Sequence, residues 1–69
     1  MNKITVTING EKVAVNADST AADAAKVLGF WNKSIVAELD GEILSKDEMD
    51  KHTLKDGSKL ELIRFVGGG

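Results

Sequence analysis

The sequence has no cysteine and no proline, and its only aromatic residues are two phenylalanines and one tryptophan. The absence of cysteine excludes disulfides, thiolate zinc sites, iron–sulfur clusters and cysteine nucleophiles. The longest apolar runs are far too short to cross a lipid bilayer, so we expect no membrane partner. The first residues lack the apolar segment of a signal peptide, and a cytoplasmic location is the default expectation.

The chain also lacks the residues that metal binding and acid–base catalysis need. His52 is the only histidine, and we expect it to be solvated or to cap a helix because no second histidine or cysteine accompanies it. The carboxylates of Asp47, Glu48 and Asp50 do not have the spacing of an EF-hand loop. We interpret them as a solvated acidic face or as a surface that meets a basic partner, and we predict no metal site.

Charge and length limit the function further. Nine basic residues are scattered among eleven acidic ones, which gives a net charge of −2 and no basic stripe, so we expect no nucleic-acid partner. The 69 residues make one small domain, which is too small to enclose an active site as well as a core. We therefore expect no enzyme, and any chemistry takes place at a surface, at a terminus or in a partner.

The first half of the chain predicts a hairpin followed by a helix. Apolar β-branched residues alternate with polar ones over residues 3–9 and the pattern continues over 11–16, with the turn pair Asn9-Gly10 between them. Thr20 is the expected N-cap of the helix, and Gly29 its expected end. The predicted buried stripe of this helix consists of Ala21, Ala24, Ala25 and Leu28.

The second half predicts two further strands, a helical turn and a last strand. The strands are expected over residues 35–39, 42–44 and 59–66, with turns at Asp40-Gly41 and Asp56-Gly57. Ser45 is expected to cap a short helical turn, and Leu54 to be buried. Phe30 is expected to close one end of the core, and for Trp31 we favour packing over binding.

This order of elements predicts an α+β fold of two layers. The main helix must bury its apolar stripe against one face of a mixed sheet. A helix after the first hairpin and a strand at the end of the chain fit a β-grasp (ubiquitin-like) arrangement, with the first and last strands as parallel neighbours at the centre. We expect residues 1–66 to form this domain and residues 67–69 to form a flexible C-terminal glycine tail.

The glycine tail follows directly on an apolar strand. Gly67, Gly68 and Gly69 have no Cβ, so they pack nothing and do not extend the strand. Fully extended, the three residues reach roughly 10 Å. Such a tail places the terminal carboxylate in a narrow pocket of another protein, although a frayed terminus has the same composition.

The last strand predicts a partner surface beside the tail. Leu60 and Leu62 share the core face, whereas Ile63 and Phe65 share the opposite face with Glu61. On the third strand, Val36 is likewise expected to point to the outer face of the sheet. An exposed apolar patch next to a mobile tail suggests a partner-binding site, and the alternative is a partly exposed edge without function.

At this point the chain resembles the ThiS family, the ubiquitin-like sulfur carriers of thiamine thiazole biosynthesis. The resemblance covers essentially the whole chain and is strongest over residues 35–44 and 54–69. Its most specific motif is the ending Arg64-Phe65-Val66-Gly67-Gly68-Gly69. The chain departs from the family pattern at Asp40, where asparagine is frequent, and at Ser45-Lys46, where Pro-Arg is common.

The resemblance implies a mechanism in which partners do the chemistry. A ThiF-like adenylyltransferase uses ATP to adenylate the carboxylate of Gly69, and a persulfide donor protein then supplies sulfur to give a thiocarboxylate. A ThiG-like thiazole synthase accepts this sulfur. The carrier itself binds no cofactor, and Gly67 and Gly68 let the tail enter a tight channel. Docking is expected to involve Val36, Ile63, Arg64, Phe65 and Val66.

Three alternatives remain open at this stage. Terminal Gly-Gly also occurs in the MoaD family, the small subunits of molybdopterin synthase, although those chains commonly carry proline shortly before it and this chain has none. A ubiquitin-like modifier would be conjugated to lysines of target proteins through Gly69. A passive β-grasp interaction domain would have an inert tail.

Overall fold

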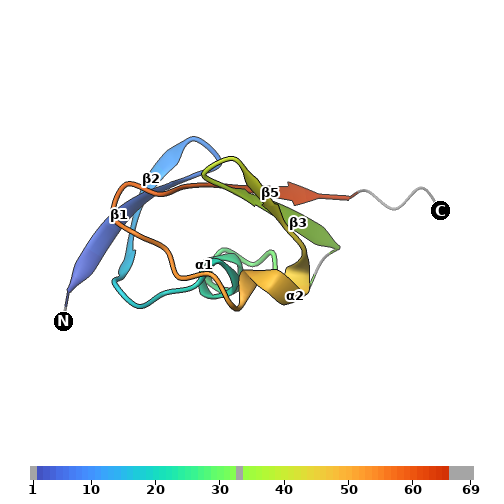
Figure 1. The fold of residues 1–69 in the computed structure, drawn as a ribbon, viewed down its shortest axis with the longest axis horizontal. Helices are drawn as coiled ribbons and strands as arrows, with labels where there is room; N and C mark the ends of the chain where they lie inside the picture. The colour runs from blue at the N-terminus through green and yellow to red at the C-terminus, as the bar shows by residue number, and fades with distance from the viewer. Residues whose placement is uncertain (1, 33, 66–69) are drawn as a thin grey trace.

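The structure is a computed structural model that describes residues 2–32 and 34–65. Five strands form one mixed sheet in the order β2-β1-β5-β3-β4, and both helices lie on the same side of it (Figure 1). The elements are β1 (Lys3–Ile8), β2 (Glu11–Asn16), α1 (Ala21–Val27), β3 (Ile35–Leu39), β4 (Glu42–Leu44), α2 (Lys46–Met49) and β5 (Lys59–Arg64). The predicted α+β, β-grasp architecture is confirmed.

The first hairpin forms as predicted. β1 and β2 pair antiparallel from Lys3–Asn16 to Ile8–Glu11, which leaves Asn9 and Gly10 as a two-residue turn. Both turn residues have positive φ, 50° for Asn9 and 86° for Gly10. Two consecutive positive φ values give the turn a twist that matches the twist of the paired strands, and this explains why Asn-Gly is favoured there.

The main helix begins where the sequence predicts. The Thr20 hydroxyl accepts from the backbone N–H of Asp23, and the Asp23 carboxylate accepts from the backbone N–H of Thr20, which makes a reciprocal capping box. At the other end, Gly29 has a φ of 82° and Phe30 donates its N–H to the carbonyl of Ala25. This hydrogen bond turns the chain back towards the helix and ends it.

The predicted burial of Leu28 is wrong. The helical segment ends at Val27, and Leu28 is its C-cap with 41% of its surface exposed. Because the chain reverses at Gly29, Phe30 packs against the core in its place, as predicted for that residue. Ala22, which was outside the predicted stripe, is fully buried with the other three alanines.

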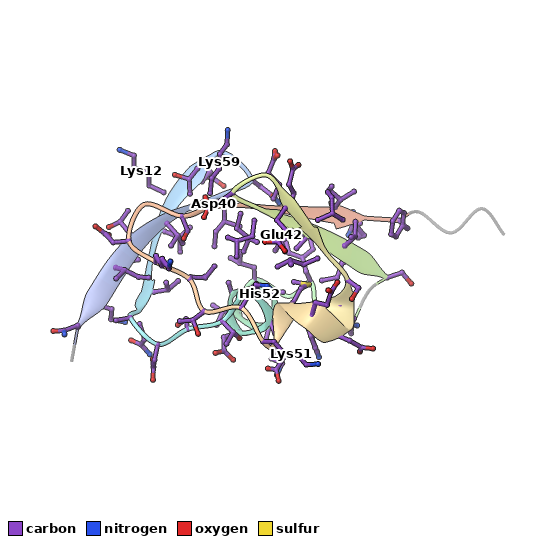
Figure 2. The ribbon with its side chains drawn as sticks, viewed as in Figure 1. Lys12, Asp40, Glu42, Lys51, His52 and Lys59 are labelled. Carbon is purple, nitrogen blue, oxygen red and sulfur yellow. The ribbon has the colours of Figure 1, made fainter. Side chains whose placement is uncertain are left out.

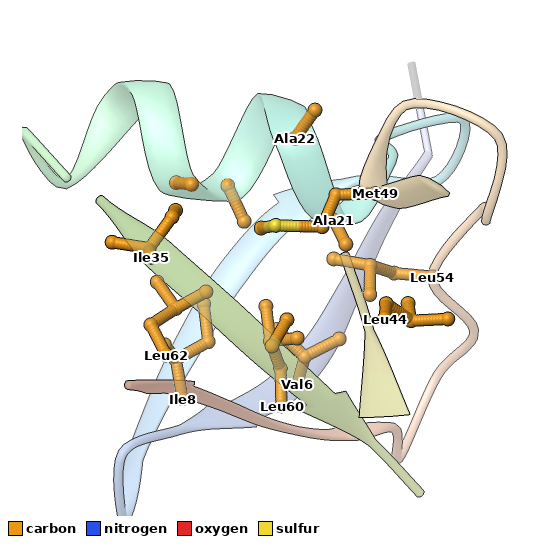
Figure 3. Close-up of a cluster of buried hydrophobic side chains, with 13 residues drawn as sticks. Val6, Ile8, Ala21, Ala22, Ile35, Leu44, Met49, Leu54, Leu60 and Leu62 are labelled. Atoms are coloured by element: carbon orange, nitrogen blue, oxygen red, sulfur yellow. The ribbon is translucent and has the colours of Figure 1, made fainter. Parts of the chain in front are cut away.

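The core lies between the sheet and the two helices. Val6, Ile8, Leu60 and Leu62 point from the central strands towards α1 (Figure 3). Buried alanines on α1 let this helix lie close to the sheet, because a methyl group takes up little space. Met49, Leu44 and Leu54 fill the space under α2, and the predicted burial of Leu54 is confirmed.

Trp31 and His52 have structural surroundings. Trp31 is half-buried against the core, and the Nζ atoms of Lys26 and Lys46 lie 5.0 and 4.8 Å from its ring centroid. The Nδ1 of His52 donates to the backbone carbonyl of Glu48, 2.9 Å away, at the end of α2. These contacts agree with the predicted packing and capping roles. Among the described residues, no helix is long and apolar enough to cross a membrane.

β5 is the central strand of the sheet. It pairs parallel with β1 at Thr7–Lys59 and Ile8–Leu60, so the first and last strands are parallel neighbours, as predicted. On its other side it pairs antiparallel with β3 over five residue pairs. The strand ends at Arg64, earlier than the predicted range, and Val66 lies outside the described residues. Phe65 still donates its backbone N–H to the carbonyl of Ser34.

Candidate functional site

The candidate site is the C-terminal end of β5 and the sheet face around it. Gly67, Gly68 and Gly69, the predicted reactive tail, lie outside the described residues together with Val66. The described residues end at Phe65, four residues before Gly69. What the structure determines is therefore how the strand that leads into the tail is held, and what surface surrounds it.

Two turn residues hold β5 from opposite sides. The Asn9 side-chain oxygen accepts from the backbone N–H of Leu62 at 2.8 Å, and an Asp40 carboxylate oxygen accepts from the backbone N–H of Lys59 at 2.8 Å. Asn9 and Asp40 both have a φ of 50°, and each is followed by a glycine of positive φ. Each turn thus supplies a side-chain oxygen where the strand ladder offers no carbonyl.

Sequence reasoning identified both residues as turn formers but missed their bonds to β5. The repeated pattern of Asn or Asp before Gly was the available signal, because these side chains carry an oxygen that bonds nearby backbone N–H groups. The oxygen is common to aspartate and asparagine. Asp40 therefore makes the same kind of contact to β5 that Asn9 makes.

The sheet face away from the helices carries an apolar patch next to the tail. Ile63 lies directly opposite Val36 in the β3–β5 register, and Ile43 lies opposite Glu38 in the β3–β4 register. The exposed fractions are 42% for Ile63, 60% for Ile43 and 59% for Phe65, whereas Val36 is half-buried. We call Val36, Ile43, Ile63 and Phe65 the outer patch.

Three members of the outer patch were predicted, and Ile43 was missed. β4 has only three residues, and Leu44 on it is fully buried, so its neighbour Ile43 must point outward. That inference needs the direction of Leu44, which the sequence did not supply. Arg64 is exposed, but its register position opposite Ile35 places it on the core side of the sheet. Its partner-binding role stays a prediction.

The outer face carries charge beside the apolar patch. Glu38 and Glu61 lie directly opposite each other on β3 and β5. They line a shallow hollow together with Asp40, Gly41 and Lys59. Figure 2 shows that Lys59 and Lys12 extend from the side of the sheet away from the helices. Apolar residues surrounded by charges of both signs are typical of a transient protein interface.

The described residues offer no group that could hold a metal ion. Glu48, far along the chain from the tail, has a pKa that departs from its usual value. The hydrogen bond from the Ser45 backbone N–H, with a smaller contribution from the Ser45 side chain, lowers the pKa of Glu48 below its usual 4.5. The Ser45–Glu48 pair is a capping box of α2, so this shift reflects helix stability and not catalysis.

The model of the ThiS family matches residues 2–69. The chain belongs to the ThiS family. The sulfur carrier protein ThiS of Bacillus subtilis is 32% identical over 63 residues, which cover 90% of this chain and 96% of that protein. The resemblance to this family of ubiquitin-like carriers, which the sequence indicated, is confirmed.

Relatives of different size and solved structures agree with this assignment. A thiazole synthase of Paramagnetospirillum magneticum is 34% identical over 62 residues, which make up 90% of this chain but only 19% of that protein. The crystal structure of a thiamine biosynthesis protein (ThiS) from Geobacter metallireducens superposes with a TM-score of 0.78 at 29% identity. That comparison covers 96% of this chain and 100% of the other. A solution structure of a thiamine biosynthesis protein from the same organism gives a TM-score of 0.72.

Proposed function

We propose that this ThiS-family carrier transports sulfur as a thiocarboxylate on Gly69 and delivers it for thiazole formation. The observation that supports this most strongly is the family match over residues 2–69, which includes the terminal Gly67-Gly68-Gly69. The absence of cysteine leaves the terminal carboxylate as the plausible attachment point for sulfur. The chain acts as a protein substrate, and other proteins supply the catalysis.

Activation of the carboxylate has to come first, because a free carboxylate is a poor electrophile. In the proposed sequence, a Gly69 carboxylate oxygen attacks the α-phosphorus of ATP in a ThiF-like adenylyltransferase, and pyrophosphate leaves. The terminal sulfur of a persulfide on a donor protein then attacks the acyl carbon, and AMP leaves. A thiol finally cleaves the resulting sulfur–sulfur bond, which leaves the thiocarboxylate and a disulfide on the donor side.

The described residues support separate roles for the outer patch, which binds the partner, and for the tail, which enters the channel. Ordering each of the glycines in a channel costs about 1–2 kcal/mol of backbone entropy. Ile63 and Phe65 are exposed apolar residues at the start of the tail, and their burial against a partner offsets this cost. The hydrogen bonds of Asn9 and Asp40 to β5 keep the starting point of the tail fixed relative to the patch.

A ThiG-like thiazole synthase is the proposed acceptor. The thiazole synthase of Paramagnetospirillum magneticum contains a segment similar to 90% of this chain. A carrier-like segment within a synthase supports the view that carrier and synthase work together. It favours the thiazole pathway over the molybdopterin pathway for this chain. We propose that the carrier acts in the cytoplasm, where ATP is supplied.

The first step can be tested by ATP–pyrophosphate exchange in the cognate adenylyltransferase. We expect exchange with the intact chain and loss of exchange when Gly69 is deleted, because the acceptor carboxylate then sits one residue too early. A circular dichroism spectrum of the deletion variant should match that of the intact chain. Equal exchange with both chains would contradict the proposal, and isopeptide-linked adducts in cell extracts would support a protein modifier instead.

A further inference from the structure

An apolar groove runs along the side of the molecule between β2 and α1, and the proposed function does not use it. Its volume is about 200 Å³, and its lining includes Val13 and Val15 from β2, Val27 from α1 and the C-cap residue Leu28. Val27 is 82% exposed and Leu28 41% exposed, although both are large and apolar. Two adjacent exposed apolar residues on a helix suggest that something covers them.

The backbone of β2 is free along the same side. β2 is an edge strand in the sheet order, with β1 as its only neighbour among the described strands. Ala17 donates its backbone N–H to the carbonyl of Asn2. This bond shows which residues of β2 direct their backbone groups towards β1. In an antiparallel ladder alternate residues bond to the partner strand, so Val13 and Val15 bond to β1. Lys12 and Ala14 direct their backbone N–H and C=O groups towards the open edge, as does the N–H of Asn16, whose carbonyl accepts from the backbone N–H of Ser19.

We propose that this edge joins two copies of the chain, with β2 paired antiparallel to β2 about Ala14. In this register Ala14 faces Ala14 of the second copy, and Lys12 faces Asn16 of the second copy. The two Ala14 residues then exchange N–H···O=C bonds, and Lys12 exchanges them with Asn16, whose carbonyl accepts from Ser19 and has a second lone pair for the added bond. The contact is isologous, so it closes at two copies and does not propagate into a fibre.

The charges of the edge fit this register. Charged side chains normally keep edge strands apart. Here Lys12 lies opposite Asn16 of the second copy, which is uncharged, and the turn that follows this Asn16 carries the acidic residue Asp18. Glu11 lies opposite Ala17 of the second copy. The pairing therefore places no like charges directly opposite each other.

The apolar groove explains why this register is favoured over an open edge. Val13 and Val15 point to the helix side of the sheet, where both pack against the core. In the proposed register, Val13 faces Val15 of the second copy. Both α1 helices then lie on the same face of the joined sheets, beside the junction of the two β2 strands. The exposed side chains of Val27 and Leu28 cover this junction. The outer patch and the ends of both β5 strands remain free for other partners.

Sedimentation velocity of the full chain tests the proposal. We expect the apparent mass to rise from 7.4 kDa towards twice that value as the concentration approaches about 1 mM. Val27→Asp should weaken the association at least about tenfold, whereas Ile43→Asp, a control at the far edge of the sheet, should leave it unchanged. A chain that stays monomeric at this concentration, or a dimer lost on Ile43→Asp and kept on Val27→Asp, would overturn the proposal.

The register can be tested with single cysteines, since the chain has none of its own. Under mild oxidation, Ala14→Cys should cross-link to a covalent dimer much faster than Lys12→Cys. The two Cα atoms at position 14 are expected about 5.5 Å apart in a directly hydrogen-bonded pair. Those at position 12 are expected about 14 Å apart, because an offset of four residues along the strand adds to the spacing between the two strands. Equal cross-linking rates would exclude this register.

Discussion

At the scale of single residues, Asn9 and Asp40 connect distant parts of the chain. The hydrogen bond from Leu62 to Asn9 spans 53 residues, and the one from Lys59 to Asp40 spans 19. Each residue also has a φ of 50°, which most residues adopt only at a cost. The two turns therefore do more than reverse the chain, because they fix the position of the strand that carries the tail.

We predict that Asn9→Ala lowers the free energy of unfolding by about 2–4 kcal/mol. Alanine strains the backbone at positive φ and leaves the part-buried N–H of Leu62 without an acceptor. Asn9→Asp keeps an oxygen and tolerates this conformation, so it should lose less than about 1 kcal/mol. Urea unfolding followed by the fluorescence of Trp31 measures both. Equal losses would show that the side-chain oxygen does not matter.

A substitution at Gly68 can test whether the tail enters a narrow channel of the adenylating enzyme. We predict that Gly68→Val slows adenylation by the cognate enzyme, because a branched side chain does not fit a channel that admits glycine. The stability of the domain should not change. The same valine placed at Lys55, an exposed position on a loop, serves as a matched control. Unchanged adenylation kinetics for Gly68→Val would contradict the narrow-channel interpretation.

At the scale of elements, the sequence predicted the helices, strands and turns best where residues close in sequence determine the structure. Turn pairs of Asn or Asp with Gly, the helix caps at Thr20 and Ser45, and alternation in the strands all occur as expected. Leu28 was misjudged because the periodic pattern includes it, whereas the helix ends at Val27 and Leu28 is its C-cap. Ile43 and the bonds of Asn9 and Asp40 depend on contacts between distant segments, which periodicity does not reveal.

The capping box of α2 should give stability a measurable pH dependence. Glu48 has a pKa lowered in the folded state, so its contribution is present above its unfolded pKa of about 4.5. It is lost as the pH falls through the lower folded pKa. We predict that Glu48→Gln flattens the fall in unfolding free energy below pH 4.5, measured by urea titrations at several pH values.

The end of β5 should matter for partners more than for folding. Phe65 is 59% exposed and Ile63 is 42% exposed, so replacing either with aspartate removes little core packing. We predict that Phe65→Asp and Ile63→Asp each weaken binding to the adenylyltransferase by about tenfold or more, while the melting temperature changes little. Isothermal titration calorimetry and thermal unfolding distinguish the two effects. A large fall in melting temperature with unchanged binding would make them structural residues.

At the scale of the whole molecule, the fold presents two exposed apolar surfaces, for which we propose different tasks. The outer patch leads into the tail, and the groove between β2 and α1 lies on another side of the sheet. The fold class and the patch could be predicted because alternation in the last strand separates a core face from an exposed face. The groove was not predicted, since it depends on where α1 ends relative to β2.

The central claim is that Gly69 carries sulfur, and intact-mass spectrometry tests it most directly. The chain is incubated with ATP, a sulfide source and its cognate adenylyltransferase, and a sample without ATP is the control. The account predicts a mass gain equal to the replacement of one oxygen by sulfur, located at Gly69 by fragmentation. An unchanged mass, with an adenylyltransferase shown to be active, would contradict the account.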